Sequence, residues 1–259
     1  MQGTPKPTYD LACECGLAGG LGFGGKTEEH VHCTISRTDI NNEESELISK
    51  PVGRYVSLFF GNVWELECDA LEEISELLGR ELAEMSKRLT GAQKPKVLVV
   101  GLGNGEIVFD SLGAQVCNCL TPNGEDFFVL EAGVFGDSGI ESQLMVKAVA
   151  DCVEADLVIA VDSLVARSEM RVGRVIQIAD SGISPASGVG RHLGEISRAT
   201  VGVPVVALGL PSALWAGEDL SCGGYLAVPE TTLLIARNAA ELIANGVKIF
   251  LQLCKPNLE

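Results

Sequence analysis

Residues 96–113, KVLVVGLGNGEIVFDSLG, join a short apolar run to a loop that contains several glycines. A strand that turns into a helix through a glycine loop is typical of nucleotide-binding α/β folds. Here Gly101 and Gly103 are present, but Glu106 stands where the dinucleotide fingerprint requires a third glycine. We therefore interpret the loop as a support for the acid that follows it, Asp110, and keep a nucleotide-binding Rossmann domain as an alternative.

The apolar runs from residue 96 onward alternate with helical or polar segments. They are nearly continuous, and they read KVLVVGL, FFVLEAG, DLVIAVDS, RVIQIADSG and VPVVALGLPS. Such runs are typical of parallel strands that are covered on both faces. Residues 69–90, 138–155 and 229–253 have the apolar spacing of helices. We predict an α/β fold with an open, doubly wound, mostly parallel sheet and helices on both faces, as in a three-layer sandwich.

In open α/β sheets, the functional crevice lies beyond the carboxyl ends of the strands. The residues expected at those ends are Asp110, Glu131, Asp162, Asp180 and the turn 209–212. Neighbouring parallel strands would bring Asp110 and Asp162 to one edge of the sheet. Two carboxylates in a partly desolvated cleft can share a proton and supply a general base and a general acid. The alternative is that each aspartate only caps the helix that follows it.

The composition limits the partners of the protein. A formal net charge of −16 over 259 residues repels phosphate backbones, so no direct nucleic-acid partner is expected. Because neither a signal peptide nor a membrane-length apolar stretch is recognisable, we expect a cytoplasmic protein without membrane contact. The nine cysteines lack C-x-x-C spacing and are expected to be reduced, buried thiols.

The first 33 residues contain few large apolar side chains and include the tract GLAGGLGFGG, residues 16–25. Such a tract does not offset its own ordering entropy, so it predicts a flexible lead-in. His30 and His32 form an H-x-H pair in this region. We interpret them as solvated histidines, and we expect no metal site there.

Five segments with a characteristic order follow the lead-in: GLGN with DSLG, DLVIAVDSLVARS, IQIADSGISPASGVG, GVPVVALGLPS and LIANG. Together they resemble the germination protease family, the spore endopeptidases that degrade small acid-soluble proteins during germination. The resemblance covers about residues 34–259. It implies an α/β endopeptidase without a cofactor that uses two aspartates, at Asp110 and Asp162 here. The chain has a more distant similarity to hydrogenase maturation endopeptidases, which use acids and a histidine around nickel, so a metal-dependent peptidase is an alternative.

The resemblance also implies an inactive precursor. The family removes its own N-terminal segment, and it cuts after an acidic residue and before a hydrophobic one. The motif SRTDI corresponds to the family's precursor motif, so the implied bond joins Asp39 to Ile40. This predicts a flexible propeptide at residues 1–39 and a single peptidase domain at residues 40–259. Asn41 departs from the alanine that is usual after this bond.

Further substrate-binding residues are expected around the two aspartates. Arg167 and Arg171 follow Asp162 and could bind a substrate carboxylate in bidentate fashion, or form surface ion pairs. The loop at residues 181–190 is rich in glycine and serine, and it is interpreted as a source of backbone donors for an oxyanion or as a connector. The expected substrate-binding residues are Asn104, Arg167, Ser181, Gly182, Ser187 and Gly188.

The resulting expectation is an aspartic-type endopeptidase that starts the degradation of small acid-soluble spore proteins in the forespore and spore core. The resemblance implies a homotetramer or another homo-oligomer. A non-catalytic sporulation protein that retains the fold is the alternative. It is motivated by Asn41 and by the short connection at residues 212–228, which is longer in the family.

Overall fold

The structure is a computed structural model that describes residues 10–19, 25–48, 50–185, 194–217 and 225–255. Its centre is a set of four adjacent parallel strands, which confirms four of the five apolar runs as parallel neighbours. The fifth run lies in the same sheet but is antiparallel to its neighbours. These strands are β4 (Val97–Leu102), β5 (Phe127–Gly133), β6 (Leu157–Ala166) and β8 (Val205–Ala216).

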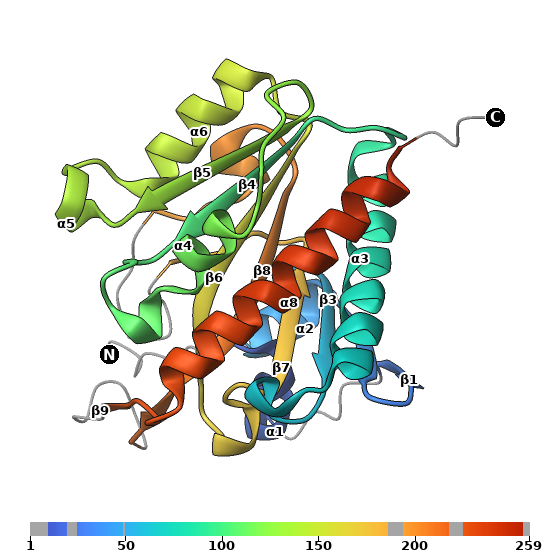
Figure 1. The fold of residues 1–259 in the computed structure, drawn as a ribbon, viewed down its shortest axis with the longest axis vertical. Coiled ribbons are helices and arrows are strands. Elements are labelled where there is room, and N and C mark those ends of the chain that lie inside the picture. Colours follow the sequence, from blue (N-terminus) through green and yellow to red (C-terminus); the bar gives the residue numbers. More distant parts are fainter. Residues whose placement is uncertain (1–9, 20–24, 49, 186–193, 218–224, 256–259) are drawn as a thin grey trace.

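Antiparallel strands extend this parallel centre on one side, so that the described residues form one mixed sheet of nine strands (Figure 1). They are β1 (Lys26–Glu29), β2 (Thr34–Ile40), β3 (Gly53–Phe59), β7 (Val175–Ala179) and β9 (Tyr225–Ala227). The order is β1-β2-β3-β7-β8-β6-β4-β5, and β9 pairs with β8. The α/β class is confirmed, whereas the antiparallel extension was not expected from the sequence.

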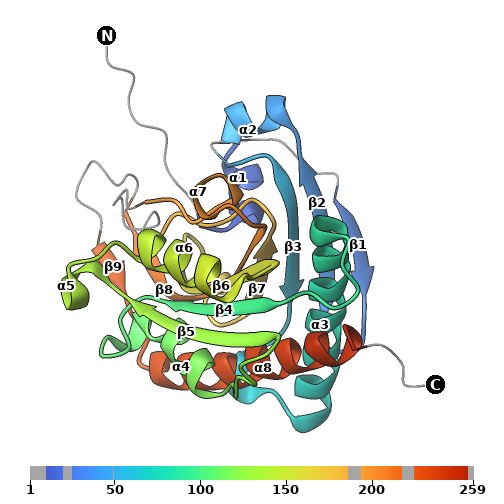
Figure 2. The same ribbon diagram turned by 90° about the horizontal axis from the view of Figure 1, so that it is seen from above.

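Helices cover both faces of the sheet (Figure 2). One face carries α3 (Cys68–Thr90), α4 (Leu112–Asn118) and α8 (Thr232–Leu253). The other carries α1 (Ala12–Gly19), α2 (Asn42–Ile48), α6 (Ser142–Val153) and α7 (Arg198–Val201). The connections contain α5 (Phe135–Ser138) and the 3-10 turns η1 (Val63–Glu65), η2 (Val108–Asp110) and η3 (Glu169–Arg171). None of the described helices is long and apolar enough to cross a bilayer.

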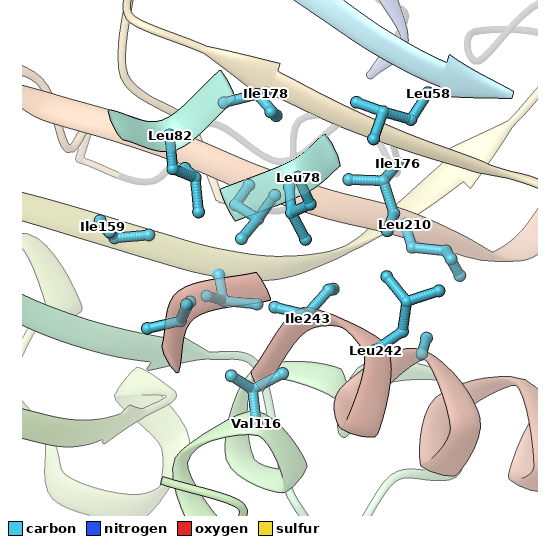
Figure 3. Packing of buried hydrophobic residues seen from close by; sticks show 14 of the residues in the cluster. Leu58, Leu78, Leu82, Val116, Ile159, Ile176, Ile178, Leu210, Leu242 and Ile243 are labelled. Carbon is cyan, nitrogen blue, oxygen red and sulfur yellow. The ribbon is translucent and has the colours of Figure 1, made fainter. Parts of the chain in front are cut away.

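The continuous apolar pattern of β4 follows from burial on both faces. Val97 and Val99 belong to the cluster under α3, α4 and α8, while Leu98 and Val100 belong to the cluster under α6 and α7. Figure 3 shows the first cluster, in which side chains of α3, α4 and α8 pack against those of the strands. Successive strand residues point to opposite faces, so both sets must be apolar.

Helices α3 and α8 cross at two glycines. A Cβ built on Gly79 would lie 2.9 Å from the carbonyl oxygen of Gly246, and a Cβ built on Gly246 would lie 2.6 Å from Cδ2 of Leu78. Gly246 interrupts an otherwise strongly helical segment of the sequence. Its role is to allow this close approach, which outweighs the cost of glycine within a helix.

The N-terminal region differs from the flexible lead-in that its composition suggested. Residues 12–19 form α1, and β2 pairs along its whole length with β3. Ile35 and Ile40 of β2 are buried. Strand pairing and specific side-chain contacts provide stabilisation that composition does not reveal. Removal of residues 1–39 as a propeptide stays a prediction.

The cysteines show no disulfide in the part of the chain that the structure describes. Cys15, Cys33 and Cys117 are buried as expected, and burial raises the pKa of each thiol, to about 11 for Cys15 and Cys117. Cys68, Cys119 and Cys152 are exposed, which differs from the expectation. They lie on surface positions of helices or just after a helix, where a small side chain needs no burial.

Candidate active site

The loop after β4 carries Asp110 back toward the strand from which it started. Gly103 has a left-handed backbone (φ +87°), and a Cβ there would lie 2.2 Å from the carbonyl oxygen of Asp110. Gly101 has a different role, since a Cβ there would lie 2.3 Å from the carbonyl oxygen of Gly113 in α4. The carboxylate of Asp110 accepts a hydrogen bond from the N–H of Asn104 at 2.8 Å. The two glycines therefore serve a tight turn and a close helix contact.

Asp162 lies inside β6 and not at its end, which corrects the position expected from the sequence. The neighbouring strand β4 pairs with β6 only as far as Val161, while β6 continues beside β8 to Ala166. The turn expected at residues 209–212 likewise lies within β8. Because β4 stops first, the sheet opens next to Asp162. The crevice therefore begins beyond the end of β4, where β6 continues without β4 as its neighbour.

Asp110 and Asp162 line the same cleft, which has a volume of about 870 Å³. The lining also includes Asn104, Ile107, Phe135, Ser184 and Asp10. Ile107 and Phe135 are exposed at 41% and 54%, so they form an apolar rim. A cleft of this size with an apolar rim and a few polar groups is typical of a binding site.

The surroundings of both aspartates favour the protonated carboxyl group. Burial raises the pKa of Asp162 well above its ordinary value, and the charges of Asp110 and Asp10 raise it further. The N–H of Ser163, which donates to Oδ1 of Asp162 at 2.9 Å, acts in the opposite direction. Burial also raises the pKa of Asp110, whereas the hydrogen bond from the N–H of Asn104 lowers it. Such a pair holds a proton more readily than separate surface carboxylates do.

Among the described residues, Asp10 is one of two further acids of the cleft lining, the other being Glu141, and sequence reasoning did not find it. Its Oδ2 accepts a hydrogen bond from the N–H of Val165 at 2.9 Å. A lone aspartate ahead of a glycine-rich tract gives no pattern that places it beside residues 155 positions later. Only the tertiary structure reveals this contact.

The other residues expected to bind substrate divide into three groups. Asn104 lines the cleft, together with Ile183, Ser184 and Pro185 of the loop after β7. Ser181 and Gly182 do not line it: the Ser181 hydroxyl lies 2.9 Å from that of Tyr55, and Gly182 forms a left-handed turn against Ser197. Ser187 and Gly188 lie outside the described residues, as does His192.

Neither arginine after Asp162 lines the cleft. The guanidinium of Arg167 lies over the ring of Trp215, 5.4 Å from its centroid, and that of Arg171 lies 4.6 Å from the centroid of Phe59. Both arginines thus contact aromatic rings through cation–π interactions.

Two further acids that were expected near the crevice lie elsewhere. Asp180 follows β7, which runs antiparallel to β8, so its end lies at the opposite edge of the sheet. There its carboxylate accepts a hydrogen bond from the N–H of Arg54 at 2.7 Å and pairs with Arg88. Glu131 is an exposed residue of the edge strand β5 and is not part of the cleft lining.

The bond between Asp39 and Ile40 lies within the sheet. Asp39 pairs with Arg54 across the β2–β3 ladder and Ile40 pairs with Gly53. Ile40 is only 3% exposed, and neither residue lines the cleft. A protease binds its substrate as an extended, unpaired strand, so cleavage here requires that β2 first leave β3.

The described residues contain no group of three or more His, Cys, Asp or Glu arranged to hold a metal ion. His30 Nε2 lies 3.4 Å from a carboxylate oxygen of Glu28, and His32 Nε2 lies 3.5 Å from one of Asp69. The H-x-H pair thus faces separate acids, and it does not form a common site.

Comparison with known proteins gives one consistent family. A family model described as germination protease matches residues 20–221. Germination proteases of Bacillus subtilis and Priestia megaterium are 33% and 36% identical over 207 and 203 residues, which is 74% and 73% of this chain. These matches cover 56% and 55% of the two relatives, so the chain spans about half of their length.

Among solved structures, a NiFe hydrogenase maturation protease from Thermococcus kodakarensis is similar with a TM-score of 0.41 and 22% identity. That match covers 65% of this chain and 99% of the other.

Proposed function

The chain belongs to the germination protease family, and from this premise we propose that it is an endopeptidase whose catalytic groups are Asp110 and Asp162. The observation that carries the proposal is that both carboxylates line one cleft, where burial and then the charge of Asp110 raise the pKa of Asp162. We further propose that its substrates are small acid-soluble spore proteins and that it acts in the forespore and spore core, as the resemblance to the family implies.

We infer the roles of the two acids from their surroundings. Asp162 is 6% exposed and has the stronger reasons to be protonated, so it acts as the general acid. Asp110 keeps a stabilising hydrogen bond from the N–H of Asn104 and acts as the general base. Asp110 takes a proton from water as the water oxygen attacks the peptide carbonyl carbon, and Asp162 gives its proton to the carbonyl oxygen. When the carbon–nitrogen bond breaks, Asp110 gives its proton to the leaving amine nitrogen. Asp162 takes a proton back from a hydroxyl of the tetrahedral diol, which becomes the carboxyl group of the product, so both acids return to their starting states.

The cleft also supports the cleavage preference of the family. The apolar rim of Ile107 and Phe135 fits the hydrophobic residue that follows the cut bond. Ser184 and Pro185, from the loop expected to bind substrate, lie on the lining. We propose self-processing at Asp39–Ile40 by the same chemistry, after release of β2 from the sheet, and assembly into a homo-oligomer.

The test is cleavage of a purified small acid-soluble spore protein, followed by mass spectrometry. Asp162→Asn and Asp110→Asn should each lower kcat by about 10²- to 10⁴-fold, the usual contribution of a general acid or base. Glu131→Gln is the matched control, because it removes one negative charge from β5 outside the cleft. Undiminished cleavage by a folded Asp162→Asn protein would contradict the proposal.

One observation favours a second candidate, a non-catalytic sporulation protein that retains the fold. Asn41 follows the predicted processing bond in place of the alanine that is usual in the family. This candidate predicts no cleavage by the wild-type protein either, even after removal of residues 1–39. A metal-dependent peptidase would instead gain activity with added divalent metal and lose it with a chelator, and the same cleavage assay distinguishes it.

A further inference from the structure

The turn that carries Asp110 has little core packing of its own. Residues 105–108 are exposed, and within the turn the N–H of Asp110 donates to the carbonyl oxygen of Ile107 at 2.8 Å. An exposed turn with few buried apolar contacts is held mainly by its hydrogen bonds to the body of the protein. The groups that make those bonds therefore determine where the Asp110 carboxylate lies.

Two serine hydroxyls of the sheet bind the backbone on either side of Asp110. Oγ of Ser212 in β8 donates to the carbonyl oxygen of Phe109. Oγ of Ser163 in β6 accepts a hydrogen bond from the N–H of Leu112 at 3.3 Å. Ser163 directly follows Asp162 in the sequence. The strand that carries one aspartate thus also holds the segment that carries the other.

The pairing of β8 is irregular at Ser212. Pro211 and Ala213 pair with successive residues of β6, so Ser212 between them has no partner in that strand. An extra residue of this kind redirects a side chain, and such irregularities are frequent next to active sites. Ser212 is 1% exposed, and a buried hydroxyl is costly unless it has a hydrogen-bond partner. The irregularity therefore places a buried donor against the turn.

Other polar side chains support the turn only locally. Oγ of Ser111 donates to the carbonyl oxygen of Val108 at 2.9 Å, and the side-chain amide of Gln115 donates to Oγ of Ser111 at 2.7 Å. These bonds fix the shape of the turn, because they join residues close in sequence. The bonds of Ser163 and Ser212 span 51 and 103 positions, so they fix where the turn lies relative to the sheet.

We propose that Ser163 and Ser212 are positioning residues for the pair of aspartates. Their hydroxyls hold the turn of Asp110 against the sheet and thereby set the distance between its carboxylate and that of Asp162. The consequence for catalysis rests on the proposed function. The position of one carboxylate relative to the other does not, because it is a property of the folded chain. Neither serine takes part in the proton transfers.

Steady-state cleavage kinetics distinguish positioning from a general loss of stability. Ser212→Ala should lower kcat about 10- to 100-fold and leave KM within about twofold, because a misplaced base slows the chemistry without weakening peptide binding. Ser86→Ala is the matched control. Ser86 in α3 is also 1% exposed, and its hydroxyl has no hydrogen-bond partner among the residues that the structure describes.

Ser163 allows a rescue experiment, because threonine and valine have nearly the same shape. Ser163→Thr keeps an oxygen that accepts from the N–H of Leu112, and it should retain the wild-type kcat. Ser163→Val removes that acceptor and should lower kcat in the same way as Ser212→Ala. Circular dichroism melting curves establish that each variant is folded.

The pKa of Asp162 reports on the same contacts without any cleavage. It is measured from the NMR resonance of its labelled carboxyl carbon, which Asp162→Asn identifies. Burial raises this pKa most, the charges of Asp110 and Asp10 raise it further, and Glu141 also lines the cleft. When Ser212→Ala is combined with Ser163→Val, Asp110 is free to move away. The pKa of Asp162 should then fall toward its value in Asp110→Asn, whereas Ser86→Ala should leave it unchanged.

Failure of this inference and failure of the proposed function look different. In an active enzyme the inference requires both a lower kcat and a lower pKa of Asp162, and either change without the other overturns it. Values equal to those of Ser86→Ala also overturn it, even if Asp162 proves essential for cleavage. A lower pKa of Asp162 in the combined variant, together with no cleavage by the wild-type protein, supports the positioning role and contradicts the proposed peptidase.

Discussion

Arg54 holds the carboxylate of Asp39 across the β2–β3 ladder, with Nε donating to Oδ1 at 2.9 Å and Nη2 to Oδ2 at 3.2 Å. This pair fixes the acid that precedes the predicted processing bond. The hydrogen bonds of Arg54 to Asp39 lower the pKa of that carboxyl, so the pair is charged at neutral pH. Any release of β2 must break it.

Replacement of Arg54 by methionine should therefore speed self-processing. An exposed ion pair contributes about 0.2–1 kcal/mol, so the opened form of β2 and the rate of cleavage should rise by roughly 1.5- to 5-fold. The measurement is the appearance of a chain beginning at Ile40, followed by intact-mass spectrometry. Arg80→Met is the control, since it removes only the exposed pair with Glu76 on α3. An unchanged rate in Arg54→Met would show that β2 release does not limit processing.

Asp162 should make the stability of the protein depend on pH. Its pKa is raised in the folded state, so the folded protein holds this proton where the unfolded chain has released it. The associated stability is fully present below the ordinary carboxyl pKa and is lost as the pH rises through the raised pKa. Asp162→Asn should thus melt at a higher temperature than wild type at pH 7, and the two should converge near pH 4. A constant difference at all pH values would contradict this assignment.

The turn that carries Asp110 should not tolerate a side chain at Gly103. Gly103→Ala forces an alanine into φ +87° and places its Cβ 2.2 Å from the carbonyl oxygen of Asp110. We expect a loss of about 1–3 kcal/mol in the free energy of unfolding, together with a large loss of kcat because Asp110 moves. Gly61→Ala is the control, because a Cβ there meets no atom within 4 Å. Urea titration and the cleavage assay measure the two effects.

In Gly246→Ala, helix propensity and side-chain packing should change the stability in opposite directions. Propensity alone predicts a gain of about 1 kcal/mol in an exposed helix. The added Cβ would instead lie 2.6–3.1 Å from three carbons of the buried Leu78 side chain. We expect packing to dominate and stability to fall by about 1–3 kcal/mol, measured as a lower urea midpoint at constant m value. Gly246→Ala combined with Leu78→Ala should recover part of the packing term, whereas additive losses would place the strain elsewhere.

The parallel half of the fold was predictable, because strands that are buried on both faces consist of continuous apolar runs such as residues 97–102. In the antiparallel half, β7 was predicted as a strand but with the wrong direction, and β1 to β3 were not predicted. Its strands β1 and β2 are short, polar and partly exposed, and β2 contains Arg37 and Asp39, which form ion pairs with other elements. Such strands are stabilised by their neighbours, and a local pattern does not reveal that.

The same contrast applies to the candidate site. Asp110 and Asp162 follow from the rule that parallel strands meet at one edge, and the structure places both in one cleft. The predicted position of Asp180 was wrong, because the rule assumes a parallel strand and β7 is antiparallel to β8. Asp10 had no signal, because a contact across 155 positions depends on the complete fold.

The crossing of α3 and α8 affects how the chain folds during its synthesis. Helix α3 and strands β4 to β8 leave the ribosome before α8 does, yet the sheet face between them is buried only when α8 packs against α3 and α4. Helix α8 also contacts η2, the turn that carries Asp110. The turn that carries Asp110 therefore gains its contacts with α8 only after residues 232–253 have been synthesised.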